Sequence, residues 1–267
     1  IKYINDENLN AKKIFSIIKN DKYLSFNKFK IKKNNNALFF KVKKETIKII
    51  ISNKKLNKLS WKNNIDLLLE CSGKYTKKKD LKFLNKKKNI KHVIISATSW
   101  DCDQTLIYGL NHNKFDKSKK YLSYGSCTVN AFSVFGQYIN KNFGIKDADV
   151  NVVHNVPDYK LNSLDTLKKK LCTLESVAPK YVDGITKSNF LVNYTIVPYS
   201  GVSMIDFRFR LKKKINKKNF VKLLKNSIEK GKLKNLYGFS QKDKNSIKFK
   251  ESKNNCDFIF EKTKYYK

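Results

Sequence analysis

Long apolar runs are absent from this sequence of 267 residues. No window reaches about eighteen uninterrupted apolar residues, and the first residues do not resemble a secretory signal peptide, so we expect no membrane-spanning helix. Cysteine is also sparse. The five cysteines form neither a C-x-x-C pair nor a metal-type cluster, which predicts no metal site. Free thiols of this kind favour a reducing, cytoplasmic setting.

Arginine is almost absent, although the chain carries a formal net charge of +36. Only Arg208 and Arg210 accompany the lysines, which are spread evenly along the sequence. Surfaces that read bases favour arginine, because its planar guanidinium donates two parallel hydrogen bonds. The abundance of Lys, Asn and Ile therefore favours the compositional bias of an AT-rich genome over a nucleic-acid-binding function. Non-specific binding to polyanions is expected in either case.

Glycine is missing from the first part of the chain, where the earliest is Gly73. A glycine-rich loop that cradles a phosphate therefore does not occur before that residue. A short apolar strand is predicted at residues 1–4, followed by Asn5 and Asp6. In doubly wound nucleotide-binding folds, an acidic residue at the end of the second strand hydrogen-bonds the adenosine ribose. Taken alone, the Asn-Asp pair is also a common turn signal.

The pattern of apolar residues predicts strands alternating with helices. Buried parallel strands are expected at 65–73, which ends in Ser72-Gly73, and at 91–96, which ends in Ser96, with a helical segment over 77–88 between them. The other expected elements are a helix within 7–25, strands within 26–52, strands at 121–123, 150–154, 193–198 and 202–211, and a helix at 217–230. An exposed connection is expected over 155–186, and the tail from residue 241 is polar and weakly patterned.

One stretch combines several signals of a reactive site: Ser123-Tyr124-Gly125-Ser126-Cys127-Thr128-Val129-Asn130. It follows a short apolar strand and precedes a helical pattern. Cys127 is therefore expected at a helix N-terminus, where unpaired N–H groups and the helix dipole favour a thiolate. His154 ends an apolar strand 27 residues downstream and is a candidate base. The structural alternatives are a small buried cysteine and a hydrogen-bonded core histidine.

The segment Ser126-Cys127-Thr128-Val129-Asn130 resembles the Ser-Cys-Thr-Thr-Asn active-site signature of phosphorylating glyceraldehyde-3-phosphate dehydrogenases, and His154 falls at the same separation as that family's catalytic histidine. The resemblance runs along nearly the whole chain and implies an α/β fold with two domains. Residues 1–126 would form a Rossmann-like, doubly wound NAD-binding domain that lacks its first strand and Gly-rich loop, through truncation or loss. Residues 127–267 would form an α+β catalytic domain with a mixed, largely antiparallel sheet.

The same resemblance implies roles for individual residues. Cys127 would be the catalytic nucleophile and His154 its base. The cofactor would be NAD and the substrate a sugar phosphate; the cofactor-binding residues would be Asn5, Asp6, Ser72 and Ser96, and the substrate-binding residues Ser126 and Thr128. Family members are usually homotetramers, and residues 155–175 match the region that crosses between subunits.

Several segments are most similar to the erythrose-4-phosphate dehydrogenase branch of this family. They are Leu56-x-x-Leu59-x-Trp61, Glu70-Cys71-Ser72-Gly73-x-Tyr75, residues 105–111 and Gly184-Ile185-Thr186-Lys187, with Lys168-Lys169 about where that branch carries paired arginines. The resemblance implies oxidation of D-erythrose 4-phosphate to 4-phosphoerythronate, for vitamin B6 (pyridoxine) biosynthesis. The phosphorylating enzyme of glycolysis is the alternative.

Other positions depart from the family pattern. The substrate-phosphate arginine that precedes Val-Pro is replaced by Ile196, and the threonine three residues after the histidine is replaced by Pro157. The chain also stops before the segment that supplies an asparagine to the nicotinamide. These departures support a second hypothesis, a degenerate family remnant with impaired catalysis. A third, a polyanion-binding protein, depends on the charge alone.

Overall fold

The computed structural model describes residues 1–21, 30–61, 63–155, 168–169, 171–198, 201–240, 245–250 and 252–266. The chain forms two compact units. One comprises Ile1–Leu68 and Lys79–Lys91, and the other comprises Leu69–Lys78 and His92–Lys267. Helices, parallel strand pairs and antiparallel strand pairs all occur, so the fold belongs to the α/β class that the sequence predicts.

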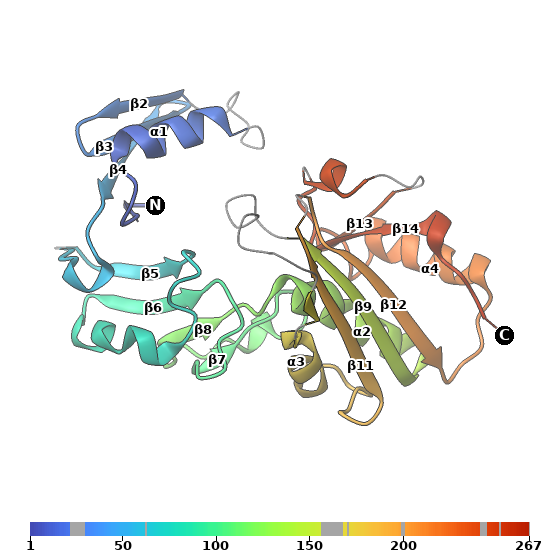
Figure 1. Cartoon of the computed structure of the whole chain (residues 1–267). Helices are drawn as coiled ribbons and strands as arrows, with labels where there is room; N and C mark the ends of the chain where they lie inside the picture. The colour runs from blue at the N-terminus through green and yellow to red at the C-terminus, as the bar shows by residue number, and fades with distance from the viewer. Residues whose placement is uncertain are drawn as a thin grey trace. The chain divides into compact units, whose positions relative to one another are not determined.

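A four-stranded sheet and one helix form most of the first unit. Its strands are β1 (Tyr3–Asn5), β2 (Lys30–Asn34), β3 (Ala37–Val42) and β4 (Glu45–Ser52), in the order β1-β4-β3-β2. Strand β1 runs parallel to β4, and the other pairs are antiparallel. Helix α1 (Ala11–Asn20) packs its buried stripe against Leu38, Ile49 and Ile51 and so covers one face of the sheet (Figure 1).

A second four-stranded sheet precedes the cysteine motif. Its strands are β5 (Ile65–Glu70), β6 (Ile90–Ile95), β7 (Gln104–Thr105) and β8 (Tyr121–Ser123), in the order β5-β6-β8-β7. The pairs β6–β8 and β7–β8 are parallel. The helical segment expected over 77–88 is the 3₁₀ helix η3 (Lys78–Lys86). Its buried Leu81 and Leu84 are three residues apart, which suits the three residues per turn of this geometry.

Helix α2 (Cys127–Phe143) packs against a third sheet to form the main core (Figure 1). The strands are β9 (Ile145–Asn155), β10 (Lys168–Lys169), β11 (Phe190–Val197) and β12 (Met204–Leu211), in the order β10-β11-β9-β12. Strands β9 and β11 are parallel, whereas β12 and β10 add antiparallel pairs, so the sheet is mixed. Alternate residues of β9, namely Ala148, Val150 and Val152, face this core because side chains alternate along a strand.

Two further helices and a two-stranded sheet complete the second unit. Helix α4 (Lys217–Lys230) confirms the helix predicted at 217–230. Strand β13 (Tyr237–Ser240) pairs in parallel with β14 (Cys256–Ile259), which lies in the weakly patterned tail. Short 3₁₀ helices also occur: η2 (Leu56–Lys58) in the first unit, and η4 (His112–Lys114), η6 (Ser246–Phe249) and η7 (Phe260–Lys262) in the second.

Helix α3 (Thr173–Tyr181) corrects the expectation of an irregular connection over 155–186. The helix forms because Leu174, Val177 and Ala178 lie on one side and are buried in the main core. Residues 156–167 of that connection, including Pro157, lie outside the described residues.

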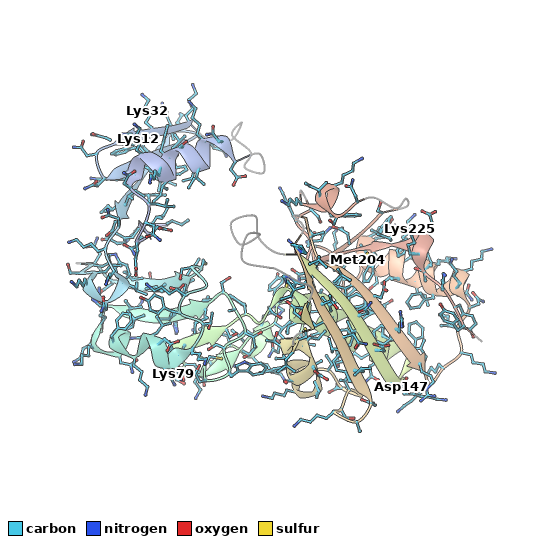
Figure 2. All side chains as sticks on the ribbon, in the orientation of Figure 1. Lys12, Lys32, Lys79, Asp147, Met204 and Lys225 are labelled. Atoms are coloured by element: carbon cyan, nitrogen blue, oxygen red, sulfur yellow. The ribbon has the colours of Figure 1, made fainter. Side chains whose placement is uncertain are left out.

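Lysine side chains cover the exterior of both units. Lys12, Lys32 and Lys79 are exposed and extend away from their elements, as Figure 2 shows. The main core, in contrast, consists of apolar residues. Within the part of the chain that the structure describes, no helix is long and apolar enough to cross a bilayer.

Candidate active site

Cys127 is the first residue of α2, as the sequence predicts. Strand β8 ends at Ser123, and a tight turn through Gly125 leads into the helix. Gly125 has φ +73°, and a Cβ atom there would lie 2.9 Å from Cγ1 of Val129, so the turn requires glycine on both counts. Ser126 is the N-cap, and its Oγ accepts a hydrogen bond from the backbone N–H of Val129 at 3.3 Å.

The turn before Cys127 is stabilised by hydrogen bonds of Ser123, which is fully buried. Its hydroxyl donates to the carbonyl of Ala97 at 2.6 Å and accepts from the backbone N–H groups of Ser99 and Gly125 at 3.2 and 3.1 Å. These bonds tie the residues after β6 to the residues after β8. The helix start is therefore fixed relative to two neighbouring strand ends.

His154 lies at the end of β9 and faces the cysteine. Its Nε2 atom is 3.3 Å from Sγ of Cys127, and its Nδ1 atom is 2.5 Å from the carbonyl oxygen of Asn155. Because a carbonyl oxygen only accepts, Nδ1 carries the proton of the neutral ring, which leaves Nε2 free to accept one from the thiol. The pair therefore has the geometry of a nucleophile and its base.

Asn155 is itself held in place. Its Nδ2 group donates to the carbonyl of Gly201 at 2.9 Å, and its Oδ1 accepts from the Ser203 hydroxyl at 3.2 Å. The carbonyl that orients His154 thus belongs to Asn155, whose side-chain amide forms hydrogen bonds through both its nitrogen and its oxygen. This support fixes the tautomer and the ring orientation that the base needs.

Cys127 is exposed as a residue, yet the atoms packed around its sulfur displace part of the solvent. This desolvation raises the pKa of the Cys127 thiol above its ordinary value, while the backbone N–H groups of Thr128 and Cys127 oppose the rise. The net direction is opposite to the expectation of a thiolate favoured by the helix start. The thiol therefore keeps its proton near neutral pH until a base accepts it.

Hydroxyl groups surround the helix start. The Oγ atom of Ser126 lies 3.0 Å from Oγ1 of Thr128 and 2.9 Å from Oγ1 of Thr173, which in turn accepts from Thr98 at 3.3 Å. Oγ1 of Thr128 also lies 3.5 Å from Sγ of the buried Cys172. The two predicted substrate-binding residues are the chain neighbours of Cys127, so their place beside it follows from the sequence alone. Thr128 is buried, however, and Ser126, rather than Thr128, caps the helix.

Two residues of β11 lie close to His154. Ile196 is its direct partner in the parallel register, and the ring of Tyr194 lies 5.5 Å from the imidazole ring between centroids. The backbone of Lys168, about where the resemblance places paired arginines, is opposite Ile196 in the antiparallel pairing of β10 with β11. No sequence signal pointed to Tyr194, because its proximity depends on strand register. Thr173 and Cys172 were missed with helix α3.

The residues predicted to contact a cofactor lie at strand ends. Ser72 and Ser96 follow β5 and β6 and are exposed; the backbone N–H of Ser72 donates to Oε1 of Glu70 at 2.8 Å, and that of Ser96 donates to the Glu70 carbonyl at 2.9 Å. In the first unit, Asn5 ends β1 and Asp6 follows it. Asn5 donates to the carbonyl of Lys54 at 3.1 Å, while its buried Oδ1 atom has no hydrogen-bond partner among the residues that the structure describes.

A cysteine at a helix start, 3.3 Å from a strand-end histidine, has the geometry that covalent chemistry on an electrophilic carbon requires. Residues 126–267 match the family model of the glyceraldehyde 3-phosphate dehydrogenase C-terminal domain. The chain belongs to the glyceraldehyde 3-phosphate dehydrogenase family.

Curated relatives agree with this assignment. The chain is 28% identical over 216 residues to glyceraldehyde-3-phosphate dehydrogenase 1 of Bacillus cereus, with 75% of this chain and 64% of the relative covered. It is 26% identical over 213 residues to the glyceraldehyde-3-phosphate dehydrogenase of Xanthobacter flavus, covering 75% and 63%. It is 30% identical over 199 residues to that of Priestia megaterium, covering 68% and 58%. The chain thus spans less than two thirds of the length of these relatives.

Proposed function

We propose that this protein oxidises a sugar-phosphate aldehyde with NAD as the hydride acceptor. The observation that carries the proposal is the 3.3 Å separation of Cys127 Sγ from His154 Nε2 at a helix start in a member of this family. A thiol with a raised pKa needs a base to become a nucleophile, and the imidazole is in hydrogen-bond reach. The geometry therefore supports covalent catalysis more than a purely structural role for either residue.

The proposed reaction begins when His154 accepts the thiol proton at Nε2 and the sulfur of Cys127 adds to the aldehyde carbon. The carbonyl oxygen takes up the charge that develops, beside the imidazolium and the N–H groups at the start of α2. The imidazolium returns its proton to that oxygen, which gives a thiohemiacetal. His154 then accepts the hydroxyl proton of the thiohemiacetal as the carbon gives up a hydride and becomes the carbonyl carbon of a thioester. The cofactor, when bound, supplies the hydride acceptor.

Cofactor binding is proposed for the strand ends that carry Asn5, Asp6, Ser72 and Ser96. The buried Oδ1 atom of Asn5, which none of the described residues hydrogen-bonds, suits a hydroxyl donor such as a ribose. A doubly wound, Rossmann-like arrangement over residues 1–126 and a catalytic domain over 127–267 form part of the same proposal. The parallel strands β6, β7 and β8 support it, since open parallel sheets bind nucleotides at their carboxyl ends.

Two aldehydes are candidates. Segments such as Glu70-Cys71-Ser72-Gly73 favour D-erythrose 4-phosphate, with water releasing 4-phosphoerythronate from the thioester in vitamin B6 biosynthesis. The relatives named above favour glyceraldehyde 3-phosphate. Inorganic phosphate would then be the acceptor, as the resemblance to the phosphorylating enzymes implies. A cytoplasmic homotetramer is expected with either substrate, and weak turnover would support the remnant hypothesis.

The test is NADH formation, followed by absorbance, with the purified chain. Each aldehyde is offered separately, with and without inorganic phosphate, to wild type, Cys127→Ser and Cys102→Ser. We expect turnover in wild type and Cys102→Ser and none in Cys127→Ser. Turnover that survives in Cys127→Ser, or no turnover of either aldehyde by a folded chain, would contradict the proposal.

A further inference from the structure

Tyr194 is an aromatic residue in contact with the candidate base, and it has no role in the proposed chemistry. Its ring centroid lies 5.5 Å from that of His154, with 51° between the ring planes. Aromatic rings at such a separation and tilt attract one another, and each limits the rotation of the other. The contact joins two neighbouring strands at the point where both approach the site.

The strand register explains why Tyr194 reaches this position. In the parallel pairing of β11 with β9, Tyr194 is opposite Val152 and Ile196 is opposite His154. Val152 is fully buried on the face of the sheet that α2 covers. His154 is two residues further along β9 and Tyr194 is directly opposite Val152, so both lie on that same face, because successive side chains of a strand point to opposite faces. Tyr194 is half-buried there, at the edge of the main core nearest to His154.

We propose that Tyr194 is a positioning residue that acts through His154. Three contacts would then fix the imidazole: the Asn155 carbonyl at Nδ1, the Cys127 sulfur at Nε2 and the Tyr194 ring at its side. An aromatic ring also stabilises a neighbouring cation through its π electrons. Tyr194 thus favours the state in which His154 has taken the proton of Cys127. The inference rests on the proposed nucleophile–base pair, but not on the identity of the aldehyde.

The ring, rather than the hydroxyl, is the part of Tyr194 that the contacts involve. None of the described residues forms a hydrogen bond with its hydroxyl. Desolvation, followed by the charges of Cys127 on α2 and of Cys172 just before α3, raises the pKa of Tyr194 to about 12. Desolvation first, and then the charges of Cys127 and Glu175, raise the pKa of the Cys172 thiol. The hydroxyl therefore stays neutral at any pH at which the site would work, and it adds no titration of its own.

The rate at which iodoacetamide alkylates Cys127, measured across pH, tests the inference without any turnover. The thiolate of Cys127 is the form that reacts. A change that makes the imidazolium of His154 less stable therefore lowers the alkylation rate at neutral pH and moves the curve of rate against pH to higher pH. We expect Tyr194→Leu to slow alkylation at neutral pH by about three- to tenfold, because a fold-change of this size corresponds to the interaction energy of one aromatic pair. Tyr194→Phe keeps the ring and is expected to stay within about twofold of wild type.

Two controls separate positioning from folding. Tyr108→Leu removes a matched ring, which lies 4.5 Å from His112 away from the site, and should leave the profile unchanged. In a His154→Gln background, Tyr194→Leu should have no further effect, because its partner is gone. Tyr194→Met fills a similar space without aromaticity and replaces Tyr194→Leu should the latter fail to fold.

Three outcomes would overturn the inference. Tyr194→Phe could slow alkylation as much as Tyr194→Leu, which would assign the effect to the hydroxyl. Tyr194→Leu could slow it equally in the His154→Gln background, which would make the role structural. An unchanged profile in a folded Tyr194→Leu or Tyr194→Met variant would show that the ring has no role. A wild-type chain with normal alkylation but no NADH formation would contradict the proposed function alone.

Discussion

Ile196 on β11 lies directly opposite His154 on β9 in the parallel register of the two strands. An uncharged, branched side chain thus occupies the position beside the base where the family resemblance places an arginine for the substrate's phosphate group. The chain carries a large excess of lysine, but its two arginines, Arg208 and Arg210, form ion pairs with Asp149 and Asp147 on β9. A bidentate phosphate ligand is therefore missing at position 196 itself.

Restoring that charge is expected to improve substrate binding. Ile196→Arg should lower the KM for a phosphorylated aldehyde by about tenfold, because a charge-assisted hydrogen bond contributes about 1.5–3 kcal/mol. Leu191→Arg adds the same charge on the opposite face of the same strand and is the matched control. Equal changes in both variants would point to general electrostatic attraction instead.

The raised pKa of the Cys127 thiol gives its reactivity a pH dependence of defined sign. Alkylation should slow as pH falls, with a midpoint above that of free cysteine, because the protonated thiol is unreactive. His154→Gln removes the proton acceptor and should slow the reaction at neutral pH by at least about tenfold. His112→Gln, a histidine outside the site, should not. A midpoint below that of free cysteine would show that the helix start dominates after all.

Gly125 should tolerate alanine less well than Gly73 does. Both residues have positive φ, +73° and +71°, but a Cβ atom at Gly125 meets Val129 at 2.9 Å, whereas one at Gly73 meets nothing within 4 Å. We expect Gly73→Ala to lower the free energy of unfolding by about 1 kcal/mol through backbone strain alone, and Gly125→Ala by about 2–3 kcal/mol. Urea titrations measure both. Equal losses would mean that the contact with Val129 relaxes without penalty.

Tyr237 is a buried polar anchor of α2. Its hydroxyl donates to the carbonyl of Ala131 at 2.9 Å and accepts from the backbone N–H of Phe135 at 3.1 Å. Tyr237→Phe removes both of these hydrogen bonds and should lower the free energy of unfolding by about 1–2 kcal/mol. Tyr138→Phe, whose hydroxyl makes one exposed bond at 3.4 Å, is the control and should cost less than about 0.5 kcal/mol.

The same residue predicts an alkaline effect on stability. Burial raises the pKa of Tyr237 well above its ordinary value of 10.0. Below that ordinary value the hydroxyl is neutral in both states; as pH rises through it, only the unfolded chain ionises, so stability falls. Tyr237→Phe should remove this part of the decline, which thermal melting above about pH 10 would reveal. An identical pH slope in wild type and variant would assign the decline to other groups.

The sequence predicted those features of the site that depend on local patterns. Cys127 at a helix start, His154 at a strand end and the helix at 217–230 each follow from periodicity over a few turns. Tyr194 could not be predicted, because its place depends on how β9 and β11 align across 40 residues of chain. Helix α3 was missed because a polar sequence surrounds its three buried residues, which form an apolar stripe only when packed against α2.

The hydrogen bond between Ser126 and Thr173 joins the N-cap of α2 to the first residue of α3. Two helices therefore begin beside one another, and the positive ends of both helix dipoles lie close to the residue before Cys127. Glu175, in the first turn of α3, offsets part of that charge. This field belongs to the backbone, so it needs no side-chain ordering. Because it is partly shielded from solvent, it is screened by salt far less than the lysines on the exterior.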